Sequence, residues 1–277
     1  HRLEGAHFAI AGFTNLTQDH LDFHGSMENY FAAKALLFTP EFSKQAIICT
    51  DDEWGTKLAG QVKIPVITIG SNGDWKTSQP NSSSNGVTTQ LIEIQNSDSI
   101  SLSVNMLGSY NATNAACALI ASRILGLQIS ASLESLKNVR PIPGRLEKVA
   151  IESPGTAIVD YAHTPDAVAT VLTVIKDSNP EMIISVLGCG GDRDPLKRPL
   201  MGKLAAQLSD IVIVTDDNPR SEDPAAIRRA VLAGASNGPA QVLEVADRRE
   251  AISQALKLAQ TGSVIAILGK GHETGQE

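Results

Sequence analysis

The sequence predicts an α/β fold with two domains: a mixed sheet with helices, followed by a Rossmann-like domain with a mainly parallel sheet. Its 277 residues are enough for two ordinary domains. Short apolar segments alternate with longer helical patterns along most of the chain, as they do in α/β proteins. Two prolines and a glycine at 140–144 mark a linker. We therefore expect domains over 1–142 and 143–277.

The first domain is expected to contain a mixed sheet. Its last two strands alternate apolar and polar residues, which is typical of neighbours in an antiparallel meander. Residues 71–86 are dense in Ser, Asn, Gly and Pro and predict a loop. The expected strands lie at 8–15, 45–50, 65–69, 90–95 and 99–107, and the expected helices at 29–38, 111–125 and 132–138.

The second domain shows a cleaner alternation, which predicts a parallel sheet with right-handed crossovers. The expected strands lie at 157–161, 182–187, 211–215, 241–245 and 263–268, and the expected helices at 165–177, 198–208, 224–235 and 248–258. Ligands of such open sheets bind beyond the carboxyl ends of the strands. The segments that follow the strands are therefore the first candidates for chemistry.

Composition limits the functions that the chain can have. It is 42% hydrophobic and 19% charged, as in soluble globular proteins. The net charge of −7 argues against non-specific nucleic-acid binding, and the 4% of aromatic residues argues against base-stacking platforms. The sequence contains no apolar run of membrane-spanning length and no signal peptide. Three cysteines without metal-ligand spacing are typical of a protein in the reducing cytoplasm, which is the location that we expect. We also expect the protein to be a monomer.

Polar clusters follow four of the strands in the second domain. One cluster alone fits an ordinary turn, but four at the same edge of a sheet predict one polar ligand site. Glycines in the second cluster let backbone N–H groups approach an anion. Neither GxGxxG nor a Walker A loop is present, so neither kind of nucleotide motif is predicted. The clusters lie at 160–166, 188–194, 216–220 and 269–273.

The stretch 215–224, TDDNPRSEDP, has two interpretations. In the plainer one a strand ends in a turn, Ser221 caps the next helix, and Glu222 and Asp223 complement the helix dipole. That interpretation does not explain Arg220, whose guanidinium fork suits a carboxylate. The pattern alone does not decide between a capped turn and a ligand site.

A second set of candidates lies in the first domain. His20 falls in the segment 14–22 after the first strand, and Lys34 lies in the apolar sequence YFAAKALLF. A buried lysine has a lowered pKa, and its neutral amine can take up carbon dioxide as a carbamate. His20 and such a carbamate are candidates to share Mg²⁺. The alternative, which spacing alone favours, is a lysine on a surface helix, and His24 is interpreted as a surface or helix-capping residue.

Long motifs of this chain resemble those of the Mur ligases, and most closely those of the MurE branch, almost from end to end. The resemblance implies an ATP-dependent amide-bond ligase of peptidoglycan synthesis. In that family ATP phosphorylates a carboxylate of a UDP-N-acetylmuramoyl dipeptide, and an incoming amine attacks the acyl phosphate. The motifs are TNLTQDHLDFHG, YFAAKALLF, DDEWG, GSYNATNAACA, PGRLE, VDYAHTPDA, GCGGDRDPLKRPLMG, TDDNPR and GKGHE.

The resemblance also implies roles for single residues. By this likeness Lys34 is carbamylated and, with His20, supports Mg²⁺. Arg2 is implied in contact with the UDP-linked dipeptide. The residues implied in ATP binding are Asn111 and Asn114 at the adenine, Arg145 at a phosphate and Asp160 at the ribose.

In the MurE branch the DNPR segment marks selection of meso-diaminopimelate over lysine, which lacks the distal carboxylate. Arg220 is then expected to pair with that carboxylate, Glu273 to accept from the distal ammonium, and Arg193 to hold the other end. Without the carboxylate Arg220 is left desolvated and unpaired, so lysine should be rejected strongly. The remaining implied contacts are Asp217, Asn218, Pro219 and the Gly269 backbone.

The chain also departs from the family pattern. It lacks the Walker A loop, the N-terminal uridine-binding domain and the upstream glutamate of the magnesium site, so we expect residues 1–277 alone to have little or no ligase activity. The alternatives are a lysine-adding or folate-type ligase, a truncated chain that only binds diaminopimelate or nucleotide, and a plain α/β binding domain. Arg220 argues against the lysine-adding form, and YAHTPDA together with DNPR argues against the folate type.

Overall fold

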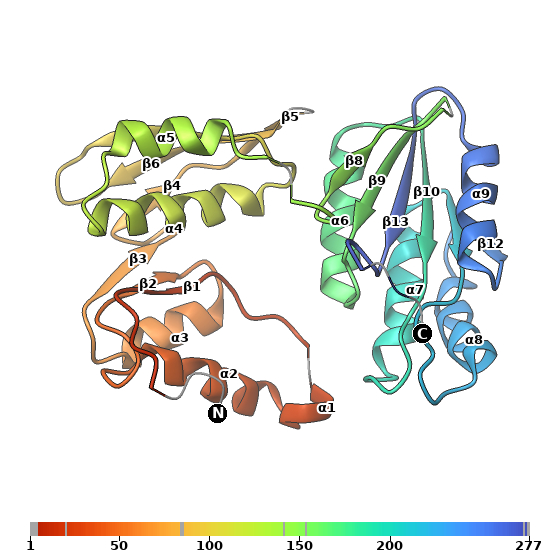
Figure 1. Cartoon of the computed structure of the whole chain (residues 1–277), viewed down its shortest axis with the longest axis horizontal. Helices are drawn as coiled ribbons and strands as arrows, with labels where there is room; N and C mark the ends of the chain where they lie inside the picture. The colour runs from red at the N-terminus through yellow and green to blue at the C-terminus, as the bar shows by residue number, and fades with distance from the viewer. Residues whose placement is uncertain are drawn as a thin grey trace. The chain divides into compact units, whose positions relative to one another are not determined.

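The chain forms two compact units, His1–Arg140 and Pro141–Glu277 (Figure 1). The computed structural model describes residues 5–19, 21–83, 86–140, 142–152, 154–273 and 275. Each unit has its own sheet and its own buried apolar core. Within the described ranges, no helix has the length and apolar character needed to cross a membrane.

The sheet of the first unit is mixed, as predicted. Its strands are β1 (Ala11–Phe13), β2 (Ala46–Cys49), β3 (Val66–Ile69), β4 (Trp75–Thr77), β5 (Asn81–Ser83), β6 (Gly86–Glu93) and β7 (Ser99–Val104). The order is β1-β2-β3-β4-β6-β5, and β7 also pairs with β6. β1 to β4 pair in parallel, whereas β6 is antiparallel to β4, β5 and β7.

Helices cover both faces of this sheet. They are α1 (Leu21–His24), α2 (Met27–Ala35) with the following 3₁₀ turn η1 (Leu36–Phe38), α3 (Glu53–Gln61), α4 (Tyr110–Ile124) and α5 (Ile129–Lys137). Ile47 of β2 joins the core under α4, and Ile48 joins the core under α2 and α3. All four residues of β2 are buried, as expected for a strand covered on both faces.

Two predictions for the first unit are wrong in part. The loop predicted at 71–86 contains β4 and β5, because Trp75 is buried in the core and β4 pairs with β6. The prediction also omits α1 and α3. Asp52 caps α3 by accepting from the Gly55 N–H at 2.5 Å. The acidic segment 51–53 therefore connects β2 to α3. Asp52 is the N-cap of α3, and aspartate is a residue type that favours this position.

The sheet of the second unit is parallel except at one edge. Its strands are β8 (Glu147–Val149), β9 (Thr156–Asp160), β10 (Met182–Leu187), β11 (Ile211–Val214), β12 (Gln241–Glu244) and β13 (Ser263–Leu268). The order is β12-β11-β10-β13-β9-β8. The predicted parallel strands β9 to β13 are confirmed. The prediction omits β8, which is short and pairs antiparallel with β9.

The four predicted helices of the second unit are present. They are α6 (Pro165–Asp177), α7 (Lys197–Leu208), α8 (Pro224–Ala235) and α9 (Arg248–Leu258). α6, α7 and α8 pack side by side, and α9 lies on the other face of the sheet (Figure 1). Ile184, Ile213 and Ile265 of the strands share a buried core with Ala251 and Ala255 of α9. These alanines allow the helix to lie close to the sheet.

Candidate functional site

The carboxyl ends of four parallel strands form one row in the second unit. Asp160 of β9 is in register with Leu268 of β13, Leu268 with Leu187 of β10, and Leu187 with Val214 of β11. The four predicted polar clusters therefore start from neighbouring positions at one edge of the sheet. The segments at these strand ends are called the rim loops here. They are numbered in chain order: 160–164, 188–194, 215–223 and 269–273.

The second and third rim loops are hydrogen-bonded to each other along their length. The Gly191 N–H donates to the Asn218 carbonyl at 2.8 Å, and Arg220 Nη1 donates to the Gly191 carbonyl at 2.7 Å. Ser221 donates to the Asp192 carboxylate through its N–H at 3.2 Å and its hydroxyl at 2.7 Å. The bonds from Ser221 lower the pKa of Asp192, because they favour its ionised form. The DNPR segment is thus one half of a two-loop unit.

A buried arginine anchors this two-loop unit. Arg198 of α7 is 4% exposed and donates to both carboxylate oxygens of Glu222, at 2.8 and 2.7 Å. Glu222 also accepts from the Asp192 N–H at 2.6 Å. The hydrogen bonds from Arg198, and then the one from Asp192, lower the pKa of Glu222. Glu222 is therefore the counter-ion of a buried cation.

One prediction for the segment 221–223 is wrong. Ser221 does not cap α8, because the carboxylate of Asp223 does so by accepting from the Ala225 N–H at 3.0 Å. Glu222, which the prediction places at the helix dipole, forms an ion pair with a buried arginine. Pro224 explains the position of the cap: a proline fits the first helical position, so the residue before it becomes the N-cap.

Arg220 is exposed and has a left-handed backbone conformation, with a φ of 51°. Few residues other than glycine adopt this conformation. The side chain lies over the glycine-rich loop, where a Cβ added to Gly190 would be 2.8 Å from Arg220 Nη1. A guanidinium has five N–H donors, so the bond to the Gly191 carbonyl leaves donors for a carboxylate.

Substitution of Gly191 by alanine is expected to lower the free energy of unfolding by about 2 kcal/mol. A Cβ at this position would lie 1.9 Å from the Pro219 carbonyl oxygen, so the two loops have to move apart. Denaturant unfolding of the chain measures the change. Gly60→Ala in α3 is the matched control, because its Cβ meets nothing within 4 Å and alanine favours a helix. Equal stability of the two variants would contradict the close packing of the loops.

The third rim loop also contacts the fourth. Lys270 Nζ lies 3.3 Å from Asn218 Oδ1 and 3.7 Å from Asp217 Oδ1. Gly269 has a φ of 109°, and a Cβ there would be 3.1 Å from Asp217 Oδ2. The structure thus brings together Asp217, Asn218 and Gly269, which the resemblance implies in diaminopimelate binding. Lys270 lies beside Asp217 and Asn218. The sequence does not predict it as a site residue, because no motif rule singles it out.

Asp160 is buried, and its carboxylate accepts hydrogen bonds from backbone N–H groups. Its Oδ2 accepts from the Leu146 N–H and its Oδ1 from the Ala162 N–H, both at 2.7 Å. Burial raises the pKa of Asp160, although the two backbone hydrogen bonds and the Arg145 charge act against that rise. Asp160 is 4% exposed. Its hydrogen bond to the Leu146 N–H fixes the segment that carries Arg145 against the end of β9. This anchoring role competes with the ribose contact that the resemblance implies.

Arg145 and Glu273 meet at Tyr161. The Arg145 guanidinium lies 4.8 Å from the centroid of the Tyr161 ring, and the Tyr161 hydroxyl donates to Glu273 Oε1 at 3.1 Å. Burial raises the pKa of Tyr161, and the hydrogen bond and charge of Glu273 raise it further. The hydroxyl therefore stays a protonated donor at neutral pH. Tyr161 links a residue implied in ATP binding to one implied in diaminopimelate binding.

The other implied residues that the structure describes form hydrogen bonds with groups close to them in sequence. Arg193 is exposed and donates to a main-chain carbonyl of its own loop at 3.1 Å. The Pro219 carbonyl accepts a main-chain N–H within the third rim loop. In the first unit, Asn111 is buried and donates to the Leu107 carbonyl at 2.6 Å, while the exposed Asn114 donates to Asn111 Oδ1 at 3.2 Å. Asn111 thus orders the start of α4.

The described residues do not fit a magnesium site built on a buried Lys34. Lys34 is exposed on α2, with Nζ 5.0 Å from the centroid of the Tyr30 ring, as the surface-helix interpretation expects. Where side chains are described, no three or more His, Cys, Asp or Glu residues are grouped to hold a metal ion. His20 and Arg2 lie outside the described residues. His24 is half-buried and stacks on Tyr30, with ring centroids 4.7 Å apart.

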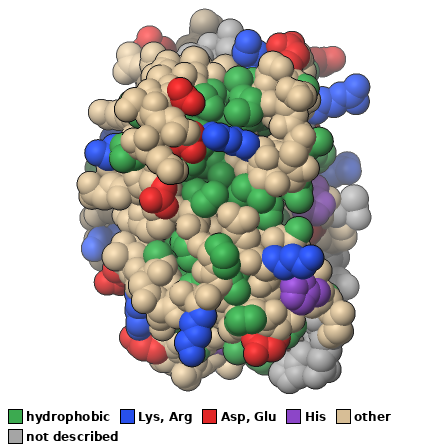
Figure 2. Space-filling model, turned by 90° about the vertical axis from the view of Figure 1, so that its left-hand side faces the viewer, with side chains coloured by type: hydrophobic (Ala, Val, Ile, Leu, Met, Phe, Trp, Pro, Cys, Tyr) green, Lys and Arg blue, Asp and Glu red, His purple; other side chains and the backbone are tan. Residues whose placement is uncertain are grey.

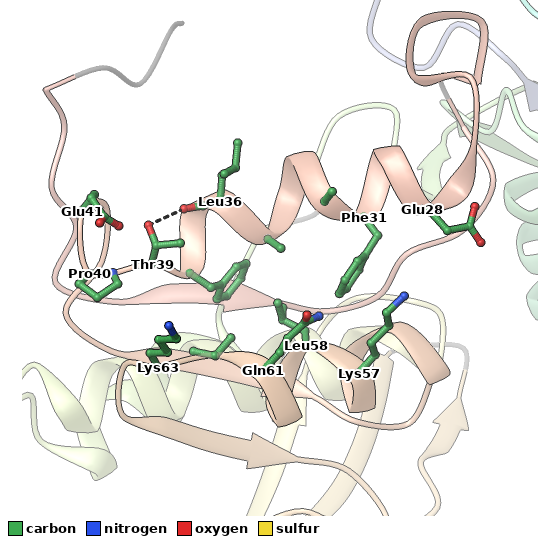
Figure 3. A pocket seen from close by; sticks show the side chains of 14 residues that line it. Glu28, Phe31, Leu36, Thr39, Pro40, Glu41, Lys57, Leu58, Gln61 and Lys63 are labelled. Atoms are coloured by element: carbon green, nitrogen blue, oxygen red, sulfur yellow. Dashed lines mark hydrogen bonds between the residues drawn. The ribbon is translucent and has the colours of Figure 1, made fainter.

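A groove of about 680 Å³ lies between α2 and α3 in the first unit (Figure 3). Phe31 from α2 and Leu58 from α3 belong to its apolar lining. Figure 2 shows hydrophobic side chains along the middle of one face of this unit, with charged side chains around them. The charged residues that line the groove are balanced in sign, so charge does not select a ligand: Glu28, Glu41, Lys57 and Lys63.

Two family models match the chain. The Mur ligase middle domain matches residues 1–122, and the Mur ligase, glutamate ligase domain matches residues 144–271. The first match ends within α4 and the second begins at Gly144, on either side of the boundary between the two units. The chain belongs to the Mur ligase family.

The chain is similar to enzymes named UDP-N-acetylmuramoyl-L-alanyl-D-glutamate–2,6-diaminopimelate ligase. The one from Corynebacterium glutamicum is 42% identical over 286 residues, which cover 99% of this chain and 55% of the relative. The one from Thermosynechococcus vestitus is 42% identical over 281 residues, with coverage of 99% and 56%. A solved structure with that name matches with a TM-score of 0.62 and 36% identity, over 100% of this chain and 57% of the other. The chain thus spans about half the length of these relatives.

Proposed function

We propose that the protein to which this chain belongs is an ATP-dependent amide-bond ligase. It adds meso-diaminopimelate to UDP-N-acetylmuramoyl-L-alanyl-D-glutamate in peptidoglycan synthesis. The observation that carries the proposal is the 42% identity, over 99% of the chain, to relatives named for that reaction. The geometry supports it, because Arg220, Gly269 and Glu273 come from rim loops that start at one edge of one sheet.

The proposed reaction has two steps. The γ-phosphoryl group of ATP passes to a carboxylate oxygen of the UDP-linked dipeptide, which yields an acyl phosphate and ADP. The amine of diaminopimelate then attacks the acyl carbon, phosphate leaves, and an amide bond forms. We assign ATP contacts to Asn111, Asn114 and Arg145, with Asp160 placing Arg145, and a contact with the dipeptide to Arg2. Mg²⁺ is implied by the family alone.

Three rim residues are proposed to recognise diaminopimelate. Arg220 pairs with the distal carboxylate, because a guanidinium fork matches a carboxylate with two charge-assisted hydrogen bonds. Glu273 accepts from the distal ammonium, and its carboxylate is already oriented by the Tyr161 hydroxyl. Arg193 is exposed and holds the other end of the amino acid. A site that matches both distal charges rejects lysine, which has only the ammonium.

The second candidate is a chain that binds but does not catalyse. It is favoured by the absence of a Walker A loop from these residues. A lysine-adding ligase is the third candidate. The division of the chain into an ATP-binding domain at 1–142 and an amino-acid-binding domain at 143–277 stays a prediction, as do the monomeric state and the cytoplasmic location.

Phosphate release separates these candidates. The chain, extended to the length of its relatives, is given ATP, the UDP-linked dipeptide and either meso-diaminopimelate or L-lysine. We expect release with diaminopimelate to exceed release with lysine by a factor on the order of 10³. Residues 1–277 alone are expected to show little release. Preference for lysine would replace the proposed substrate, and no release with either amino acid would favour the binding-only chain.

A further inference from the structure

Lys197 is a buried cation at the start of α7, directly after the second rim loop. It is 9% exposed, and its ammonium has no hydrogen bond or ion pair with any residue that the structure describes. The next residue, Arg198, is also buried, but it has Glu222 as a counter-ion at 2.7 Å. A buried charge without a counter-ion destabilises a folded chain, so the position of Lys197 needs an explanation.

The carboxylates that flank the start of α7 are engaged with other donors. Asp194 Oδ1 accepts from the Leu196 N–H at 2.9 Å. The carboxylates of Asp192 and Glu222 hold the second rim loop against the third, as described above. Within the described part of the chain, these bonds leave Lys197 without a negative partner.

The side chain of Lys197 extends beyond the N-terminus of α7, toward the second rim loop. Side chains of a helix lean toward its N-terminus, and Lys197 is the first residue of α7. Met201, one turn later on the same face, is fully buried, with Sδ 3.7 Å from Cys189 Sγ. Burial raises the pKa of Cys189 to about 12, although the nearby charge of Lys197 opposes that rise. The thiol is therefore neutral at neutral pH and supplies no counter-charge.

Backbone donors lie in the same region. Cys189 is 4% exposed, and buried N–H groups are seldom left unpaired. Among the described residues, the N–H groups of Cys189 and Gly190 have no acceptor, whereas those of Gly191 and Asp192 do. No side chain caps the N-terminus of α7. Helix N-termini and glycine-rich loops of this kind bind anions through their N–H groups.

We propose that Lys197, the first turn of α7 and the N–H groups of Cys189 and Gly190 form a binding site for a phosphate group. A lysine is a point charge that suits a tetrahedral phosphate, whereas a planar carboxylate matches an arginine fork such as that of Arg220. Donors from a helix end and from a loop also surround a tetrahedral group better than a planar one.

The source of the phosphate rests on the proposed function. In that reaction the amine nitrogen bonds to the acyl carbon, and the bond from this carbon to the phosphate oxygen breaks. Phosphate leaves with the electron pair, and the nitrogen releases its proton to water. Lys197 stabilises the negative charge that builds up on the leaving phosphate.

The first test measures stability in a buffer free of phosphate and sulfate. Lys197→Met removes the charge and keeps an unbranched side chain, and Lys203→Met, at an exposed lysine of the same helix, is the control. We expect Lys197→Met to raise the equilibrium constant for folding of residues 1–277 about tenfold, because it removes a buried cation without a counter-ion. The control should leave that constant nearly unchanged. A less stable Lys197→Met chain would assign Lys197 to the fold alone and overturn the proposal.

The second test measures binding of inorganic phosphate to residues 1–277 by titration calorimetry at constant ionic strength, with acetate as the carboxylate probe. The native chain and Lys203→Met should bind phosphate, and Lys197→Met should bind it about tenfold more weakly. Lys197→Arg keeps the charge and should bind more tightly than Lys197→Met. Equal phosphate binding by the native chain and Lys197→Met, or Lys197-dependent binding of acetate that is tighter than that of phosphate, would overturn the proposal.

The third test uses the extended enzyme. Lys197→Met is expected to lower kcat about 100-fold, with KM for diaminopimelate nearly unchanged, because the charge on the leaving phosphate develops in the transition state. A raised KM with unchanged kcat would place a carboxylate of the amino acid at Lys197 and contradict the phosphate site. If the native extended enzyme forms no amide, the proposed function fails, whereas the phosphate titration still decides whether the site exists.

Discussion

Replacement of Arg220 by methionine is expected to lower kcat/KM for meso-diaminopimelate about 100-fold in the extended enzyme. A guanidinium makes two charge-assisted hydrogen bonds with a carboxylate, and their loss corresponds to about 3 kcal/mol. Arg220 suits this role because it is exposed at the rim and, among the residues that the structure describes, its side chain donates one hydrogen bond, to the Gly191 carbonyl. Steady-state kinetics with saturating ATP and dipeptide measure the loss.

Lysine is the control substrate for this prediction. It has no distal carboxylate, so Arg220→Met should leave its low kcat/KM nearly unchanged, and discrimination between the two amino acids should fall about 100-fold. Arg220→Lys keeps the charge without the fork and should lie between the two. If both amino acids lose activity equally, Arg220 acts instead through its bond to Gly191, as a support for the loop. Thermal unfolding of each variant checks that alternative independently.

The second unit could be predicted closely from sequence because its central strands are buried on both faces. Ile211–Val214 is a continuous apolar run, Met182–Leu187 is apolar except for Ser185, and each is followed by a helix with clear boundaries. The first unit was harder to predict. β4 is three residues long and exists because it pairs with β6, so its Ser- and Gly-rich surroundings conceal it. Strand pairing over such distances leaves no local pattern.

The candidate site was predictable in position but not in its internal contacts. Parallel strands place their carboxyl ends at one edge, so the four polar clusters had to be neighbours. The bonds between Asp192 and Ser221, which are 29 residues apart, depend on register and loop path. For the same reason the sequence pattern predicts Ser221 as the cap of α8, where the structure has Asp223. An apolar segment does not say which face of its helix is covered, so the sequence left both positions of Lys34 open, and the structure has the exposed one that spacing alone favours.

Glu222→Ala is expected to lower the free energy of unfolding of the chain by about 3 kcal/mol at neutral pH. The side chain of its partner Arg198 is only 5% exposed, so the substitution leaves a buried guanidinium without a counter-ion. Denaturant unfolding measures the change. The exposed pair of Arg229 and Asp223 is the matched control, since side chains exposed by 66% and 60% gain little from pairing, and Arg229→Ala should change stability by at most about 0.5 kcal/mol.

The pH dependence of that difference identifies its cause. The pKa of Glu222 in the folded chain is below its ordinary value of 4.5, first because of the Arg198 hydrogen bonds. A lowered folded pKa means that the stabilisation is complete above about pH 4.5 and is lost as the pH falls through the folded pKa. The gap between the native chain and Glu222→Ala should therefore narrow on acidification. A gap that is constant with pH would point to lost packing instead. A stability difference that narrows on acidification would show that the Arg198–Glu222 ion pair stabilises the folded chain. Glu222 also accepts from the Asp192 N–H, so the same ion pair holds the second and third rim loops together.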